Sequence, residues 1–146
     1  GRNVTIVLSA AGTPTVTVYG LDYLGQPMAE AFTAAGTTPV VGKKAFKEVQ
    51  SISTSATVAG TINVGYGNVL GLPFAATAIL EEYVDQVVPP VGTKVVAFLP
   101  VQTATSNDPR GTWTPEATVI PNGSREYILH CHAVEGDYHG QPHFAG

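Results

Sequence analysis

The sequence predicts an all-β protein, either an antiparallel β-sandwich or a jelly-roll-like barrel, with at most one short helix. Val and Thr are abundant, at 19 and 17 of the 146 residues, and β-branched residues favour strands. Sixteen Gly and eleven Pro are interleaved with apolar runs and follow no repeating period, which indicates many turns. Short stretches of apolar–polar alternation recur about every 8 to 12 residues, the spacing typical of antiparallel strands joined by turns.

The first part of the chain contains two clear strand patterns. Residues 3–9 and 14–20 both alternate with a period of two, and the short connection 10–13 suits a hairpin between them. Residues 22–27 then form a predicted turn. Residues 28–35 partly fit both the helix and the strand template, and the neighbouring strands favour a strand.

The middle of the chain is predicted to be a loop, a strand and a glycine-rich corner. Residues 36–44 read as a loop, and residues 45–54 as a strand that contains a bulge. Residues 58–74 then form a strand that ends in Gly65, Gly67 and Gly71, where glycine supplies positive φ or allows close backbone approach. This Gly spacing opens no helix and precedes no Lys-Ser/Thr pair, so a phosphate-binding loop is not expected.

The next stretch is the best helix candidate in the chain. In residues 75–88, Ile79, Tyr83 and Val87 recur at helical spacing, although a β-branched strand fits nearly as well. Residues 94–101 form a continuous apolar run, which is typical of a strand buried on both faces.

The remaining elements are predicted to be short. Residues 102–113 are polar and rich in turn formers, so we expect an exposed loop that carries Arg110 and Trp113. A short strand over 116–120, a tight turn over 121–124 and a last strand over 126–134 complete the chain. The length suits a single domain over residues 1–146, with a C-terminal tail over about 135–146.

The charge content excludes some classes of partner and favours others. With a net charge of −4 and only seven Lys and Arg, the chain lacks the positive field that nucleic-acid binding needs. No run approaches the ~20 apolar residues of a membrane span, so no membrane partner is expected. Charged residues make up only 12% of the chain, which suggests that part of its surface is covered in an assembly.

All four histidines and the only cysteine lie near the C-terminus. His130 and His132 would project to the same side of a strand, where Glu135, Asp137, His139 or His143 could complete a metal site. This spacing matches no specific template, so we favour ordinary hydrogen bonding by these histidines and expect no metal or other cofactor. Cys131 would point the other way, as a small core residue. The chain contains no Gly-x-Ser-x-Gly motif and no obvious carboxylate pair, so we expect no enzymatic activity.

Seven short segments follow one another in order along almost the whole chain: Arg2–Ile6, Val18–Asp22, Gly25–Met28, Gly42–Lys47, Ile62–Pro73, Asp108–Thr112 and Phe144–Gly146. Together they resemble a family of tailed-bacteriophage capsid proteins known as decoration or cement proteins. Similar proteins carry more residues before the first strand, so an N-terminal arm is expected to be missing here.

This resemblance implies a structural virion protein without catalysis. Such a protein binds the outer surface of an icosahedral head and stabilises contacts between major capsid subunits, so its partners are the major capsid protein and neighbouring copies of itself. We expect the contacts in loops and at the chain ends. The interface candidates are Lys43, Lys44, Arg110, Trp113, Tyr138 and Phe144.

Two other functions stay open. A β-sandwich module that binds a glycan or a host surface would be favoured by an exposed aromatic pair near Tyr66, Trp113 or Tyr138. A metal-dependent enzyme built on the histidine-rich end is the last alternative.

Overall fold

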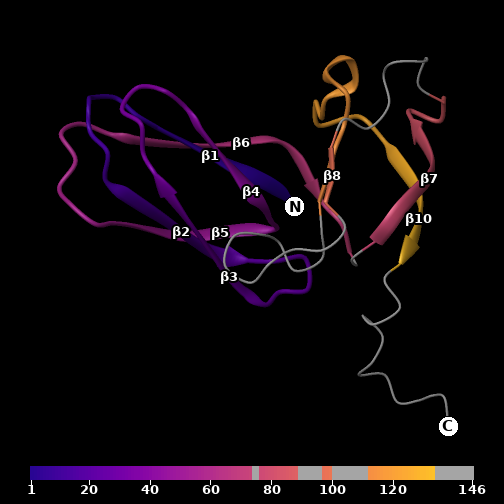
Figure 1. Ribbon diagram of the computed structural model, residues 1–146, viewed down its shortest axis with the longest axis horizontal. Coiled ribbons are helices and arrows are strands. Elements are labelled where there is room, and N and C mark those ends of the chain that lie inside the picture. Colours follow the sequence, from indigo (N-terminus) through magenta and orange to yellow (C-terminus); the bar gives the residue numbers. More distant parts are fainter. Residues whose placement is uncertain (74–75, 89–96, 100–111, 134–146) are drawn as a thin grey trace, which may run out of the picture.

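The computed structural model describes residues 1–73, 76–88, 97–99 and 112–133, and every described strand pairs antiparallel (Figure 1). The described residues thus form the all-β antiparallel fold that the sequence predicts. The strands are β1 (Arg2–Leu8), β2 (Thr15–Leu21), β3 (Pro27–Thr33), β4 (Val40–Phe46), β5 (Glu48–Thr54), β6 (Ile62–Gly71), β7 (Ala76–Val84), β8 (Ala97–Leu99), β9 (Thr112–Thr114) and β10 (Tyr127–Ala133).

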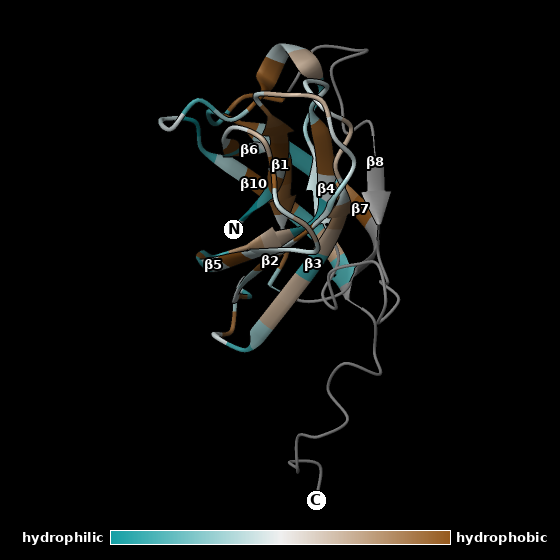
Figure 2. Cartoon of the chain, turned by 90° about the vertical axis from the view of Figure 1, so that its left-hand side faces the viewer, coloured by the Kyte–Doolittle hydropathy of each residue, from teal (hydrophilic) through white to brown (hydrophobic). Residues whose placement is uncertain are grey.

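The strands form three sheets. A five-stranded sheet has the order β4-β1-β6-β9-β8, a three-stranded sheet has the order β3-β2-β5, and β7 pairs with β10. The first two sheets face each other as a curled sandwich. In the side view of Figure 2, β3 and β4 lie on one side of this sandwich, and β5 and β6 lie on the other.

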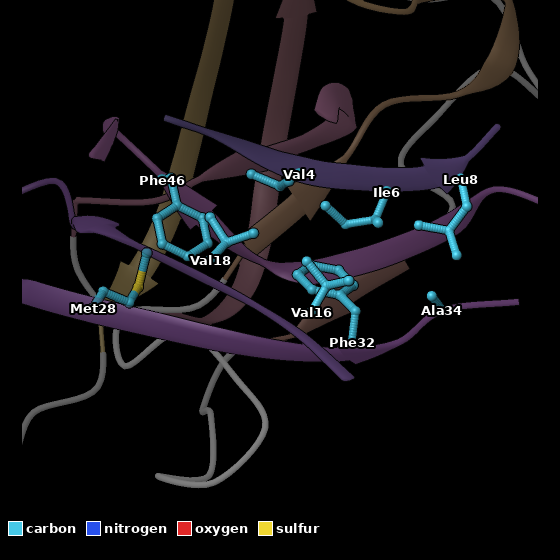
Figure 3. Close-up of a cluster of buried hydrophobic side chains, with 9 residues drawn as sticks. All are labelled: Val4, Ile6, Leu8, Val16, Val18, Met28, Phe32, Ala34 and Phe46. Carbon is cyan, nitrogen blue, oxygen red and sulfur yellow. The ribbon is translucent and has the colours of Figure 1, made fainter. Parts of the chain in front are cut away.

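The main core lies between these two sheets because their inward positions are apolar. Val4, Ile6 and Leu8 of β1 alternate into the interior, and Val16 and Val18 of β2 meet them from the facing sheet (Figure 3). The cluster is completed by Met28, Phe32, Ala34 and Phe46. This alternation is the period-two pattern visible in the sequence. Burying each Val, Ile, Leu, Met or Phe side chain of the cluster contributes about 1.5 to 3 kcal/mol relative to leaving it exposed.

The predicted hairpin between the first two strands is wrong. β1 pairs with β4 and β6, whereas β2 pairs with β3 and β5, so the connection between β1 and β2 crosses from one sheet to the other. Two strands with the same apolar alternation can bury their side chains by facing each other across a core just as well as by pairing edge to edge.

The predicted loop over residues 36–44 and the predicted strand over 45–54 also need correction. Val40–Phe46 is strand β4 in the first sheet, and Glu48–Thr54 is strand β5 in the second sheet. The chain changes sheets at Lys47, whose N–H donates to the carbonyl of Leu21. The change of face between Phe46 and Val49 marks this crossing. The predicted bulge lies within β5 at Gln50, where the pairing with β2 shifts between Tyr19–Ser51 and Gly20–Val49.

The predicted glycine corner is part of one long strand. Gly65, Gly67 and Gly71 all lie within β6, and none of them has a positive φ. Close backbone approach is the alternative that the structure confirms, since a Cβ at Gly67 would lie 2.6 Å from Asn3 Oδ1 and one at Gly71 would lie 2.8 Å from the Cβ of Ala45.

A bulged region around Asn3 accounts for these close approaches. Between the pairs Arg2–Leu70 and Val4–Tyr66, the three β6 residues 67–69 face Asn3 alone. On the other side of β1, between the pairs Asn3–Ala45 and Thr5–Val41, the three β4 residues 42–44 face one residue of β1. The fully buried Asn3 side chain fills the space between the strands. Its Nδ2 donates to the carbonyl of Gly42 at 2.8 Å, and its Oδ1 accepts from the N–H of Val69 at 3.0 Å.

Two predictions in the C-terminal half are wrong. The best helix candidate is strand β7, which pairs with β10 along its length, so its β-branched alternative was the correct one. The predicted strand over 116–120 contains a short 3₁₀ helix over Ala117–Val119. Arg125 donates to the carbonyls of Thr118 and Ile120, which satisfies these groups without a partner strand.

The predicted turn over 22–27 and the last strand are confirmed. Asp22 Oδ1 accepts from the N–H groups of Leu24 and Gln26, and Gly25 has a φ of 80°. Of the strand predicted over 94–101, the described residues contain β8 alone.

Candidate functional site

The two sheets of the sandwich are joined on one side. Glu30 of β3 accepts from the N–H of Lys43 at 2.7 Å and from the N–H of Lys44 at 3.2 Å, so its carboxylate links the edges of β3 and β4. Burial raises the pKa of Glu30, although these two hydrogen bonds and the two lysine charges act in the opposite direction. Lys44 Nζ donates to the carbonyl of Ala29 and strengthens the same junction.

On the opposite side of the sandwich, where Figure 2 places β5 and β6, an apolar groove lies between these two strands. The groove has a volume of about 520 Å³, and the buried side chains of Val4 and Phe46 belong to its lining. The lining consists of Gly1, Arg2, Val4, Phe46, Lys47, Val49, Ile52, Val64, Gly65 and Tyr66.

The apolar side chains of β5 in this groove occupy core-facing positions. Ile52 pairs with Val18 of β2, and Val49 pairs with Gly20, so each lies on the same face of the sheet as the buried core. Both side chains are nevertheless 41% exposed. They are core-facing residues that no described part of the chain covers completely.

The facing wall on β6 has the same property. Val64 pairs with the buried Ile6, and Tyr66 pairs with the buried Val4, so their side chains also project toward the interior. Val64 is 37% exposed and Tyr66 is 71% exposed. The groove is therefore an extension of the main core that no described part of the chain covers.

Two strand edges border this groove. Among the described strands, β5 pairs only with β2, so its other edge has no partner. β6 pairs with β9 only at Leu70 and Gly71, which leaves the same edge of residues 62–69 without a partner strand in the described structure. Unpaired edges present backbone N–H and C=O groups that can pair with another chain.

The charged groups in the groove lining are both positive. Arg2 lies with its guanidinium carbon 4.2 Å from the centroid of the Tyr66 ring, and its Nε donates to the carbonyl of Gly67 at 2.8 Å. Its Nη2 is 3.4 Å from Asn68 Oδ1. Lys47 contributes the second cation, and the lining contains no carboxylate. These contacts hold the Tyr66 ring in place at the rim.

A second, smaller cavity of about 350 Å³ lies where β6 and β9 meet β10. Trp113, which is 2% exposed, packs edge-to-face against Tyr127 at a centroid distance of 5.2 Å. Cys131 also lines this cavity, and burial raises the pKa of its thiol, which disfavours the reactive thiolate. These residues belong to a second apolar cluster, as expected for Cys131.

The structure describes three of the six interface candidates, and only one of these is exposed. Lys43 lies on the surface of β4, whereas Lys44 is 9% exposed and hydrogen-bonded to β3. Trp113 was expected in an exposed loop, but it is a core residue of β9, because the large ring fills the space between β9 and β10. Arg110, Tyr138 and Phe144 lie outside the described residues.

The histidines show the expected alternation. His130 and His132 are exposed on β10, and Cys131 between them packs against the second cluster. His130 Nδ1 lies 3.0 Å from Glu81 Oε2. Within the described ranges, no three His, Cys, Asp or Glu side chains are grouped so that they could hold a metal ion. His139 and His143 lie outside these ranges.

Most of the groove was not identified from the sequence. The sequence points to Tyr66 only as a possible glycan-binding aromatic, and no motif marks Arg2, Val49, Ile52 or Val64 as binding residues. The alternation of Val64 and Tyr66 on β6 is equally typical of a fully covered strand.

No known family model, curated protein or solved structure matches this chain. No described helix is long and apolar enough to cross a membrane. The function proposed below therefore rests on the groove and on the sequence features described above.

Proposed function

We propose that this protein is a structural virion protein, a capsid decoration protein that binds the outer surface of an icosahedral phage head. The observation that carries the proposal is the core-facing groove between β5 and β6, which the described residues leave partly exposed. Its four exposed apolar side chains, Val49, Ile52, Val64 and Tyr66, favour a macromolecular partner that covers them. The ordered sequence segments that resemble decoration proteins favour a capsid subunit as this partner.

The groove also suits repeated binding on a lattice. It provides a small apolar surface on a rigid β framework, and such a surface gives a modest affinity for each copy. Many copies on one shell, each in contact with major capsid subunits and neighbouring copies, would stabilise the particle collectively. The protein acts in this proposal as a binding and stabilising element without catalysis.

Co-sedimentation of the purified chain with phage heads that lack their decoration protein tests this proposal. We expect the chain to sediment with the heads to a saturating copy number and to raise the temperature at which the heads disrupt, because ligands that bind only the intact state stabilise it. The same chain unfolded in advance by heat is the control. Absence of sedimentation at micromolar concentration would contradict the proposed function.

Tyr66 favours one alternative, a module that binds a glycan on a host surface. Its ring is 71% exposed and is supported on one face by Arg2, an arrangement on which a sugar ring could stack. The groove lining, however, contains no Asn, Gln, Asp or Glu side chain that would recognise hydroxyl groups. Binding to a glycan array that Tyr66→Ala abolishes would favour this alternative over head binding.

A further inference from the structure

We propose that the groove binds an extended segment of a partner protein. This segment adds one strand to the edge of β6 that has no partner among the described strands over residues 62–69, and it inserts its apolar side chains between β6 and β5. This inference rests on the proposed function for the identity of the partner, a capsid subunit. The mode of binding follows from the backbone edges, the side-chain register and the charge of the groove. Strand addition supplies affinity through main-chain hydrogen bonds and specificity through alternate side chains.

The two edges differ in their suitability as a template. On β5, the pairing with β2 shifts between Tyr19–Ser51 and Gly20–Val49, so Gln50 is a bulged residue in the middle of the strand. Bulges distort an edge and weaken its pairing. On β6, residues 62–66 pair with β1 without any shift. An incoming strand therefore pairs best with residues 62–66.

The register determines where the side chains of such a strand would lie. Neighbouring residues on adjacent strands project to the same face of a sheet, so alternate side chains of the added strand would join Val64 and Tyr66 on the core-facing side. There they would meet Val49 and Ile52 across the groove. The added strand would supply the layer that these partly exposed side chains lack.

The charge of the groove specifies a further feature of the segment. The chain has a net charge of −4, yet the groove lining contains Arg2 and Lys47 and no carboxylate. Arg2 uses its Nε for Gly67 and one terminal nitrogen for Asn68, and the remaining guanidinium N–H groups can donate to an incoming acceptor. The preferred segment thus combines alternating apolar residues with an Asp or Glu at the end near Arg2.

Hydrogen exchange of the full chain, free and bound to undecorated heads, tests this mode of binding. Amides of residues 62–66 that face the groove should exchange at least ~10-fold more slowly when the chain is bound, because strand pairing protects them. Amides of β3, on the joined side of the sandwich, should not change. Binding without slower exchange in residues 62–66 would overturn the inference while leaving the proposed function intact.

Two lysine substitutions on β6 provide a matched pair. Val64→Lys places a charge in the groove and should weaken head binding by at least ~10-fold, because an unpaired charge is costly to bury. Asn63→Lys places the same charge on the exposed outer face and should change binding less than ~2-fold. Asn63→Lys should unfold at the same urea concentration as the parent within error, whereas Val64→Lys, at a side chain that is 37% exposed, should lower the midpoint only slightly. Both variants are then folded under the conditions of the binding assay. Equal binding by the two variants would overturn the inference.

Two further outcomes separate the inference from the proposed function. If the parent chain does not bind heads, a nine-residue peptide with Val at alternate positions and one terminal Asp serves as the probe. Slower exchange of residues 62–66 with this peptide, and not with the same peptide carrying a central Pro, would support the inference. Unchanged exchange with both peptides would overturn it.

A concentration-dependent dimer that Val64→Lys disrupts would also overturn the inference, by assigning the groove to a second copy of the chain.

Discussion

Replacing Asn3 with alanine removes the side chain that bridges two bulged strands in the first sheet. Asn3 is fully buried, its Nδ2 donates to the carbonyl of Gly42 in β4, and its Oδ1 accepts from the N–H of Val69 in β6. Because both strands bulge at this point, the two backbone groups lie away from the regular ladder. Asn3→Ala would remove the side-chain partner of both groups, of which the Gly42 carbonyl is buried and the Val69 N–H is partly buried.

The magnitude follows from these two hydrogen bonds. Each is worth about 1 kcal/mol net, and an unsatisfied buried backbone group costs about 1 to 3 kcal/mol. We therefore expect the free energy of unfolding to fall by roughly 2 to 4 kcal/mol, allowing for partial relaxation of the site. This is a large part of the ~5 to 15 kcal/mol that stabilises a typical domain.

Urea denaturation followed by tryptophan fluorescence measures this loss, because Trp113 is the only tryptophan and is buried in the native state. Asn68→Ala is the matched control. The Asn68 side chain is exposed, and its Oδ1 is 3.4 Å from Arg2 Nη2, so its loss should cost less than ~0.5 kcal/mol.

A double-mutant cycle with Gly67 tests the same geometry independently. In the parent, Gly67→Ala would place a Cβ 2.6 Å from Asn3 Oδ1, and we expect overpacking to cost about 1 to 3 kcal/mol. In the Asn3→Ala background the clashing amide is absent, so the second substitution should cost clearly less. An Asn3→Ala loss below ~0.5 kcal/mol, or strictly additive effects, would refute the bridging role.

Three further predictions concern other parts of the chain. Burial raises the pKa of Glu30 above its ordinary value of 4.5, so the native state binds the carboxyl proton of Glu30 more tightly than the unfolded state does. The stability that protonated Glu30 contributes therefore falls as the pH rises from 4.5 through the raised pKa. The stability of the parent relative to Glu30→Gln, measured by urea denaturation, should therefore be greater at pH 4 than at pH 7; a difference in the opposite direction would contradict the assignment. In the tight turn after β7, Gln86 has a φ of 65°, so Gln86→Gly should raise the free energy of unfolding by about 0.5 to 1 kcal/mol, and a loss of stability in the same assay would show that the turn is not strained. Deleting residues 136–146 should weaken head binding in the sedimentation assay more than it lowers the urea midpoint, and equal losses would argue against a role of the tail in binding.

The sequence was sufficient to predict the strands that alternate most regularly. The patterns over residues 3–9, 14–20 and 126–134 correspond to β1, β2 and β10, because period-two alternation is a local property of a strand with one buried face. The pattern over 75–88 was ambiguous, since apolar residues at helical spacing also occur in a β-branched segment. Its long pairing with β10 determined that this segment is a strand.

Strand partners could not be deduced from the same patterns. β1 pairs with β4 and β6 rather than with its neighbour in sequence, and the chain changes sheets at Lys47. Alternation specifies which side chains project to the same face, but it does not specify which strand lies beside them. The two hydrogen bonds of the Asn3 side chain, to backbone groups in the bulges of β4 and β6, depend on these long-range pairings.

The candidate site depends on tertiary structure in the same way. Sequence alone placed Ile62, Val64 and Tyr66 at alternate positions of β6, which is typical of a strand with one core-facing side. On β5, Val49 and Ile52 are three residues apart, and the bulge at Gln50 brings them to the same face. Only the arrangement of the two sheets decided that Val49, Ile52, Val64 and Tyr66 remain exposed while Trp113 is buried. The physical reason is that burial is a property of the neighbours a side chain meets in space, whereas the sequence records only the side chain's own preference for burial.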